Sequence, residues 1–226
     1  MDKNEFSQQF SFERYYHLAH INFATWYRFF YIFREIIDFK PENILEIGEG
    51  SGVIRNCLGS AVKEYKTLDV NEKLAPDILS DVRRFKNELR EKFQCVIAAD
   101  ILEHIPFSDF AGSIRNIFDY LLPGGEAVIT IPHRRYHFLF MTSATRPHVL
   151  TIPIGFLKLH DFYSRFIRRK IEIDPHHCWE IGDGKIERQK IESIFKESGF
   201  VISKFKKLIY VDFWVLKKHR LSHSAN

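Results

Sequence analysis

Residues 43–52 read Asn-Ile-Leu-Glu-Ile-Gly-Glu-Gly-Ser-Gly, and this stretch decides the fold. The apolar run 43–47 has the length and composition of a buried strand, and the glycines that follow permit a tight turn. Residues 53–58 then have the pattern of a helix start. A strand, a glycine-rich turn and a helix in this order form the place where an α/β sheet binds a nucleotide-like ligand.

The spacing of the glycines narrows the class of ligand. The dinucleotide fingerprint G-x-G-x-x-G would need a glycine at position 53, where this chain has Val53. Glu49 places a carboxylate inside the turn, where it would repel a pyrophosphate. These two residues argue against a nicotinamide dehydrogenase. They favour a nucleoside that lacks phosphate and carries positive charge, and S-adenosylmethionine, with its ammonium and sulfonium groups, is such a molecule.

Short apolar runs alternate with helical stretches over residues 41–131, which predicts βαβ units and a parallel sheet. We expect strands at 43–47, 64–70, 78–79, 95–99 and 127–131, and helices at 53–58, 83–92, 108–122 and 185–198. The runs 201–208 and 210–216 are so closely linked that they should pair antiparallel. The fold class expected is therefore α/β: a Rossmann-like, doubly wound sheet, mostly parallel with an antiparallel C-terminal strand, plus an N-terminal helix and an inserted helical lid.

The chain should form a single domain over residues 1–226 with four parts. They are an N-terminal helical cap (1–40), a cofactor-binding core (41–131), a substrate-side insertion (132–184) and a C-terminal helix with strands (185–216).

Carboxylates stand at the ends of the predicted strands. Asp69 ends the second strand 23 residues after Glu46, and an acid in this place can accept hydrogen bonds from two ribose hydroxyls. Asp81 follows the short third strand and could accept from an adenine amino group. Val70 and Val82, which follow these acids, are included in the expected cofactor site.

Five segments together resemble the class I S-adenosylmethionine-dependent methyltransferases: 44–52, 67–69, 76–81, 93–106 and 121–126. The chain is most similar to the small-molecule and glycoconjugate branch of the methyltransferase type 11 kind, with Leu-Glu-His after the fourth strand. The resemblance implies that Glu46, Gly48, Glu49, Gly50 and Gly52 hold the methionine moiety, Asp69 the ribose and Asp81 the adenine. It also implies that Ala98, Ala99 and Asp100 line the cofactor and open toward the acceptor.

Two residues depart from this family's pattern. Gln94 stands where an aspartate is common, at the base of the fourth strand, where it should not disturb the cofactor. Glu49 stands where the family often has cysteine or another small residue, and it would either crowd the methionine end or contact its ammonium.

Histidines are the candidates for a general base, which a hydroxyl acceptor would require. His104 leads by its position after the fourth strand, and its alternative is a helix-start histidine bonded to backbone. His133 follows the fifth strand, and His177 belongs to a His-His-Cys-Trp-Glu segment similar to a substrate-side loop of related methyltransferases. Because adjacent ligands at 176–178 would rarely meet tetrahedral geometry, we expect no metal site there.

The insertion is basic and aromatic. Residues 132–170 hold eight Arg or Lys and one Asp, a local charge of 8 − 1 = +7 against +4 for the whole chain. The run 154–170 has the pattern of an amphipathic helix with a basic end, which would either pack as a lid or lie on an anionic membrane surface.

Composition excludes several classes. The 226 residues, 45% hydrophobic, suffice for a sizeable core, and three distant cysteines imply no disulfide framework. With no leader pattern at residues 1–10 and no apolar run of about 20 residues, we expect a cytoplasmic protein, with membrane association on the cytoplasmic face as the alternative. No motif for nucleic acid is visible.

The function expected is methyl transfer from S-adenosylmethionine to a small-molecule or glycoconjugate acceptor, with oxygen as the acceptor atom. The alternatives are a catalytically inactive binding module that keeps the fold and a peripheral membrane enzyme acting on a lipid-linked substrate. The sequence leaves the oligomeric state open.

Overall fold

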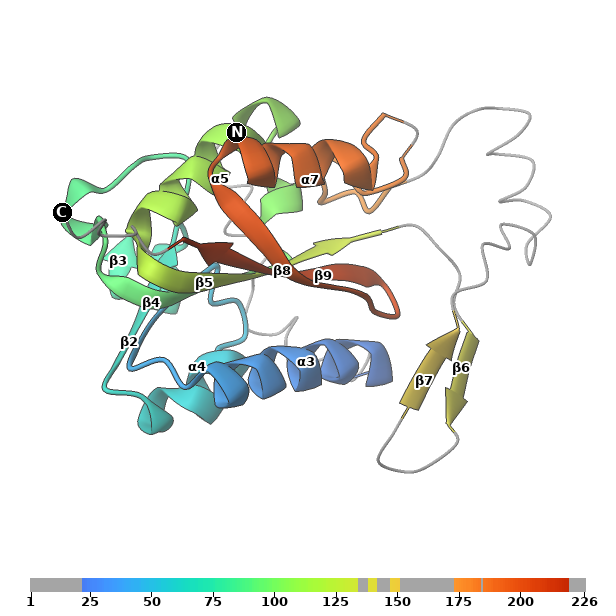
Figure 1. The fold of residues 1–226 in the computed structure, drawn as a ribbon, viewed down its shortest axis with the longest axis horizontal. Helices are drawn as coiled ribbons and strands as arrows, with labels where there is room; N and C mark the ends of the chain where they lie inside the picture. Colours follow the sequence, from blue (N-terminus) through green and yellow to red (C-terminus); the bar gives the residue numbers. More distant parts are fainter. Residues whose placement is uncertain (1–21, 134–137, 142–146, 151–172, 184, 220–226) are drawn as a thin grey trace, which may run out of the picture.

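A seven-stranded sheet forms the centre of the protein (Figure 1), as seen in a computed structural model that describes residues 22–133, 138–141, 147–150, 173–183 and 185–219. The strand order is β3-β2-β1-β4-β5-β9-β8. The strands are β1 (Asn43–Ile47), β2 (Glu64–Asp69), β3 (Ile78–Leu79), β4 (Phe93–Ala99), β5 (Leu121–Pro132), β8 (Phe200–Lys207) and β9 (Val211–Lys218).

The direction of the strands creates a crevice next to β1. Strands β1 to β5 run parallel, whereas β9 pairs antiparallel with both β5 and β8. The chain proceeds outward from β1 to β2 and β3, and then returns to the other side of β1 to form β4 and β5. The loops after β1 and β4 therefore diverge at the carboxyl ends of neighbouring strands, which is where open α/β sheets bind ligands. The expected fold class is confirmed.

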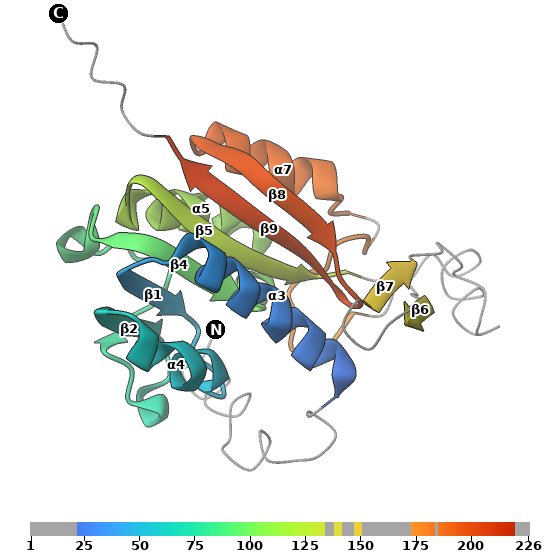
Figure 2. The same ribbon diagram turned by 60° about the horizontal axis from the view of Figure 1, so that its bottom comes forward.

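Helices cover both faces of the sheet (Figures 1 and 2). Helices α3 (Phe23–Phe39) and α4 (Val53–Leu58) lie on one face, and α5 (Phe107–Tyr120) and α7 (Arg188–Glu197) lie on the other. Side chains of β4 alternate between the two cores, with Cys95 and Ile97 in the cluster under α3 and Val96 and Ala98 in the cluster under α5. Burial on both faces explains why β1 and β4 are nearly continuous apolar runs.

Helix α3 confirms the predicted N-terminal helix within the described residues. Asn22 caps it, since its Oδ1 accepts a hydrogen bond of 3.0 Å from the Thr25 backbone N–H. Ile32 and Ile36 are buried against the sheet, and the buried Glu35 pairs with Lys204 of β8 at 2.6 Å. The buried side chains of α3 share a core cluster with residues of β4, β5 and β9, and this packing fixes the helix on the sheet.

The prediction of a helix at 83–92 is wrong. Only a short 3-10 turn forms there, η4 (Asn87–Leu89). The tertiary structure provides other partners for this backbone: Asn116 of α5 donates to Val82 O at 2.8 Å, and Tyr120 Oη accepts from Lys86 N at 3.0 Å. The other 3-10 turns among the described residues are η2 (Gly59–Ala61), η3 (Glu72–Leu74) and η5 (Leu102–His104).

Strand β5 begins earlier than expected, at Leu121 rather than Ala127, because the Pro-Gly-Gly segment stays within the sheet with a register irregularity against β4. An added Cβ at Gly125 would come within 2.9 Å of Gln94 O, so this close approach needs glycine.

The insertion contains a two-stranded antiparallel sheet, β6 (Phe138–Met141) with β7 (Pro147–Leu150). The helix predicted at 154–170, and with it the proposed membrane contact, lies outside the described residues.

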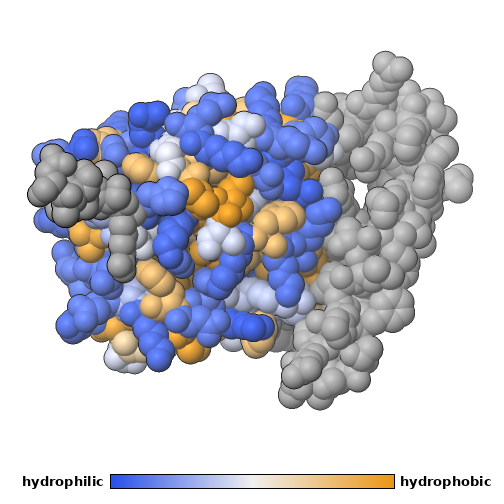
Figure 3. All heavy atoms as spheres, in the orientation of Figure 1, coloured by the Kyte–Doolittle hydropathy of each residue, from blue (hydrophilic) through white to orange (hydrophobic). Residues whose placement is uncertain are grey.

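Among the described helices, none combines the length and apolar character needed to span a bilayer. On the face of the molecule shown in Figure 3, hydrophilic residues predominate and hydrophobic ones occur in small groups.

Candidate functional site

The glycine turn after β1 has the backbone conformation that its residues predict. Gly48, Gly50 and Gly52 have φ values of 77°, 54° and 68°, in the region that favours glycine. An added Cβ at Gly48 would lie 2.2 Å from Ile101 Cγ2, so only glycine lets the segment after β4 come this close to the turn. Ile101 therefore packs directly against the turn.

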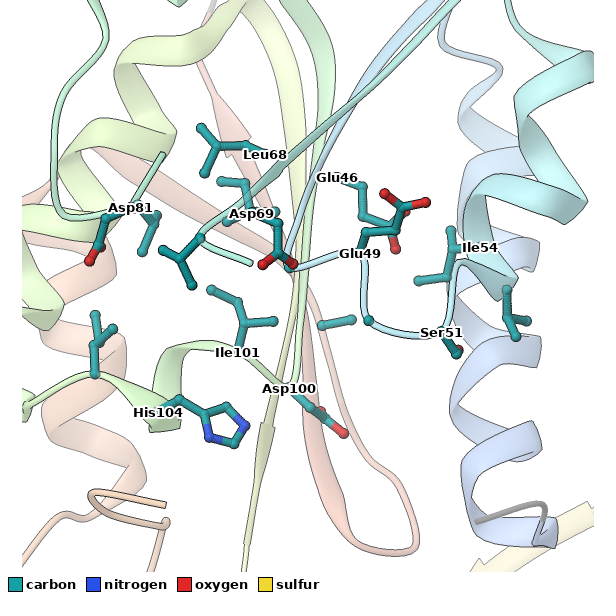
Figure 4. A pocket seen from close by; sticks show the side chains of 18 of the residues that line it. Glu46, Glu49, Ser51, Ile54, Leu68, Asp69, Asp81, Asp100, Ile101 and His104 are labelled. Carbon is teal, nitrogen blue, oxygen red and sulfur yellow. The ribbon is translucent and has the colours of Figure 1, made fainter. Parts of the chain in front are cut away.

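One cavity joins this turn to the ends of the neighbouring strands (Figure 4). Ten of the eleven residues predicted to hold the cofactor line it: Glu46, Gly48, Glu49, Gly50, Asp69, Val70, Asp81, Val82, Ala99 and Asp100. Gly52 is not among them, whereas its neighbour Ser51 is. The acids at the ends of β1, β2 and β3 thus face a common hollow, as predicted. Their roles toward a cofactor stay predictions.

Glu46 is the most deeply buried acid of the cavity, with 2% of its surface exposed. Tyr65 Oη donates a hydrogen bond of 2.8 Å to its Oε2. Burial raises the pKa of Glu46 to about 8, and Glu49 adds to this while the Tyr65 hydroxyl opposes it. The carboxyl group is thus poised to ionise when a cation approaches.

Glu49 extends from the turn itself. Its Oε2 lies 3.7 Å from Arg55 Nη1, and this buried oxygen accepts no hydrogen bond from the described residues. A buried charged oxygen in this state is costly, so the turn is suited to a ligand that donates hydrogen bonds or carries positive charge.

Asp69 and Asp81 are held by the chain that follows each of them. Asp69 Oδ1 accepts from Asn71 N at 2.8 Å, and burial raises the pKa of its carboxyl despite this bond. Asp81 is less buried and pairs with Arg83, whose Nε lies 3.0 Å from its Oδ1. Burial alone would raise the pKa of Asp81, but the Arg83 guanidinium and backbone N–H lower it.

A polar cluster on the far side of the cavity was missed by sequence reasoning. Asp100 accepts hydrogen bonds from Arg28 of α3, from Tyr210 Oη at 2.9 Å and from Thr130 Oγ1 at 2.5 Å. Arg28 also lines the cavity. Its only signal in the sequence is a cation within an aromatic helix, and the helix pattern gives no hint that Asp100 is its partner. The cluster fixes Asp100, a residue with a left-handed φ of 54°.

The three predicted catalytic histidines have different surroundings. His104 lines the cavity, its Nδ1 lies 3.0 Å from His176 O, and burial lowers its pKa. His177 is not among the lining residues, but its ring packs edge-on against that of His104 with centroids 4.9 Å apart. His133 is buried elsewhere, with Nε2 3.2 Å from Leu208 O. The structure therefore brings His104 and His177 together beside the cavity but not His133.

Gln94 lies at the opposite end of the sheet from the turn. Its Oε1 accepts from Glu42 N at 2.5 Å, and its backbone N–H donates to Asn43 Oδ1 at 2.7 Å. This departure from the family pattern is therefore structural.

Comparison with known proteins places this geometry in context. The sequence profile of a family described as "Methyltransferase domain" matches residues 18–203. No curated protein sequence matches the chain significantly.

Solved structures with the same fold include two that contain the demethylated cofactor. One is magnesium protoporphyrin IX methyltransferase from Synechocystis PCC 6803 with bound SAH, with a TM-score of 0.63 and 11% identity, covering 96% of this chain and 100% of that one. The other is 1,6-didemethyltoxoflavin-N1-methyltransferase from Burkholderia thailandensis with its substrate and S-adenosylhomocysteine, with a TM-score of 0.62 and 11% identity over 96% and 87% of the two chains.

A third similar structure is an S-adenosylmethionine-dependent methyltransferase from Clostridium acetobutylicum ATCC 824, with a TM-score of 0.58 and 11% identity over 96% of this chain and 98% of that one. At these identities the likeness concerns the fold.

Proposed function

The chain belongs to the methyltransferase domain family and is an S-adenosylmethionine-dependent methyltransferase, and from this premise we propose that it methylates a hydroxyl oxygen of a small-molecule or glycoconjugate acceptor. The observation that carries the proposal is a cavity in which acids from three strand ends and His104 meet.

The glycine turn fits the methionine part of the cofactor. Glu49 offers a buried oxygen that lacks a hydrogen-bond donor, and Glu46 lines the same cavity. An ammonium group would supply the missing donors and the compensating charge. Gly48 and Gly50 both line the cavity, and their positive φ values shape the turn against which the amino-acid part of the cofactor would lie. We propose that Glu49 contacts the ammonium rather than crowding it.

The nucleoside part would lie along the ends of β2 and β3. Asp69 presents a fixed carboxylate at the carboxyl end of β2, where two ribose hydroxyls could donate to it. Val70 and Val82 supply apolar surface for the adenine, and Asp81 stands beside them at the end of the short β3. This arrangement orients the sulfonium toward the segment that follows β4.

The acceptor would enter between Asp100 and His104 (Figure 4), across Ile101 from the glycine turn. The cofactor supplies a methyl group already activated by the sulfonium, so the protein has mainly to align the acceptor with it and exclude water. The hydrogen bonds of Asp100 to Arg28 and Tyr210 hold this wall in place.

Oxygen is the acceptor atom that this wall favours. His104 lines the cavity next to the proposed acceptor position, and the carbonyl of His176 at its Nδ1 would orient the ring so that Nε2 can accept the proton of a hydroxyl. Nitrogen acceptors often present a lone pair without such help, so a histidine at this position is most useful for a hydroxyl.

The proposal is tested in two steps. Titration calorimetry with S-adenosylmethionine and S-adenosylhomocysteine should give saturable binding with one site per chain. A screen with radiolabelled donor should then transfer label to hydroxyl-bearing small molecules or glycoconjugates from cell extracts. Label confined to amines would overturn the assignment of oxygen, and cofactor binding without any transfer would support the inactive binding module.

A further inference from the structure

Three side chains next to the cofactor cavity converge on one point, and we propose that they bind a divalent transition-metal ion. They are Glu103 and His104 from η5 and His177 from the segment before α7. One donor atom from each side chain lies within 4.8 Å of the donor atoms of the other two. His177 Nε2 is 3.9 Å from Glu103 Oε1. Small side-chain rotations would bring these atoms to the separation of about 3.4 Å that tetrahedral ligands at about 2.1 Å require.

The surroundings of Glu103 favour a bound cation. Its side chain is fully buried, and neither carboxylate oxygen accepts a hydrogen bond from another described residue. A buried carboxylate that accepts no hydrogen bond is strongly unfavourable, because nothing replaces the water that it has lost. A metal ion would supply both the charge and the ligand bonds that this group lacks.

The two histidines have the outer contacts that metal ligands usually have. His104 Nδ1 lies 3.0 Å from His176 O, and His177 Nδ1 lies 2.8 Å from Glu180 Oε1. With an Nδ1–H donating to each of these oxygens, the lone pair resides on Nε2 of both rings. Metal-binding imidazoles are commonly oriented by such a bond to a carbonyl or a carboxylate. This pattern would also raise the basicity of the coordinating nitrogens.

The segment that carries His177 is fixed to the segment that carries the other two residues. Cys178 N donates to Glu103 O at 2.8 Å, and Trp179 Nε1 donates to Ile105 O at 3.0 Å. Trp179 is itself buried, and its ring packs edge-on against those of Phe107 and Phe110. The relative position of the three ligands is therefore built into the packing of the protein, and a site fixed in this way is preorganised for an ion.

The ligand set indicates the kind of ion. Two imidazoles and one carboxylate suit Zn²⁺, Fe²⁺, Co²⁺ or Mn²⁺ better than Mg²⁺ or Ca²⁺, which prefer oxygen. Three protein ligands leave coordination positions open, as in catalytic sites. Because His104 also lines the cofactor cavity, the ion would lie next to the acceptor end.

The metal site adds to the proposed function, and it rests on that function for the position of the methyl acceptor. An ion on His104 Nε2 and a proton taken from the acceptor compete for the same lone pair. In the ion-bound enzyme His104 is therefore a ligand, and an acceptor oxygen on an open position would be polarised by the ion.

Co²⁺ is a suitable probe, because its visible d–d absorption reports its coordination. The full-length protein, first treated with a chelator, should take up one equivalent of Co²⁺ with a saturable visible band, and Zn²⁺ should displace it. Glu103→Gln keeps the side-chain shape and should weaken Co²⁺ binding on the order of 100-fold, at least as much as the loss of an outer contact usually does. His177→Gln should weaken Co²⁺ binding to a similar extent, and Glu180→Gln should weaken it about 10-fold.

Two controls separate the site from adventitious binding. His219→Gln removes an exposed histidine after β9, and Cys178→Ser removes an exposed thiol next to the ligands. Both should leave the Co²⁺ affinity unchanged. Titration with S-adenosylmethionine on the same samples shows whether each variant is folded.

The outcomes are distinct. S-adenosylmethionine binding without a saturable Co²⁺ band, or equal Co²⁺ affinity in wild type and Glu103→Gln, overturns the metal site and leaves the proposed function standing. Co²⁺ binding that depends on Glu103 and His177, without any cofactor binding, supports the metal site and overturns the proposed function.

Discussion

Replacing Glu46 by glutamine should stabilise the cofactor-free protein at neutral pH and weaken its affinity for S-adenosylmethionine. The buried carboxyl of Glu46 has a pKa of about 8 against an ordinary value of 4.5, mainly because burial disfavours its charged form. Glutamine keeps the size of the side chain and an oxygen that can accept from Tyr65, but it has no charge to desolvate.

The pKa of Glu46 fixes the sign and the size of the effect on stability. Because it is higher in the folded than in the unfolded state, the native protein holds a proton that the unfolded chain has lost between pH 4.5 and 8. Stability therefore falls as the pH rises through this window, by about 1.4 kcal/mol per pH unit. From pH 5.5 to 7.5 this amounts to about 2–3 kcal/mol, a loss that Glu46→Gln should remove.

Urea unfolding of wild type and Glu46→Gln at pH 5.5, 6.5 and 7.5 measures the loss of stability that Glu46 causes. Contributions from other titrating groups cancel in the difference between the free energies of unfolding of the two proteins. The advantage of the variant should grow by about 2–3 kcal/mol across the series. Glu42→Gln, which removes an exposed glutamate just before β1, controls for the loss of one carboxylate.

Calorimetry measures the effect on binding. If Glu46 must ionise to face the ammonium of the cofactor, binding at pH 7 should release a proton, visible as a dependence of the heat on the buffer. The variant should bind about 10- to 100-fold more weakly, as expected for the loss of a charged hydrogen bond. A pH-independent stability difference would refute the burial argument, and unchanged affinity without proton release would remove Glu46 from the cofactor site.

Three further changes test other parts of the cavity. Gly48→Ala should destabilise the protein by about 1–3 kcal/mol in thermal or urea unfolding and abolish cofactor binding, since its Cβ would lie 2.2 Å from Ile101 and φ is positive; wild-type affinity would show that the turn can shift. Asp69→Ala should lower S-adenosylhomocysteine affinity in calorimetry by about 10- to 100-fold, because two ribose hydroxyls lose their acceptor; an equal affinity would place the ribose elsewhere. His104→Gln should retain cofactor affinity and lower single-turnover methyl transfer, measured without added metal, by about 100-fold or more, the contribution typical of a general base; full transfer would exclude His104 as the base of the ion-free enzyme.

The fold was largely predictable because its determinants are local. The strand 43–47, its glycine turn and the helix after it depend on apolar runs and backbone freedom that adjacent residues specify, and β1 and α4 begin and end where these predict. The helix expected at 83–92 failed for the opposite reason. Its helix-favouring charged residues were outweighed by hydrogen bonds with Asn116 and Tyr120 of α5, more than 30 positions along the chain.

The cofactor side of the site follows from the sequence, because a parallel sheet brings the carboxyl ends of its strands to one edge. Glu46, Asp69 and Asp81 could therefore be placed together from their positions after successive strands. The contacts on the opposite side of the cavity were decided by tertiary structure. Arg28 meets Asp100, and His177 meets Glu103, across 72 and 74 positions of chain, through helix and loop packing that no local pattern encodes. The position of a residue along a strand determines where on the sheet its side chain lies. The contacts that this side chain makes above the sheet depend on how separate elements pack.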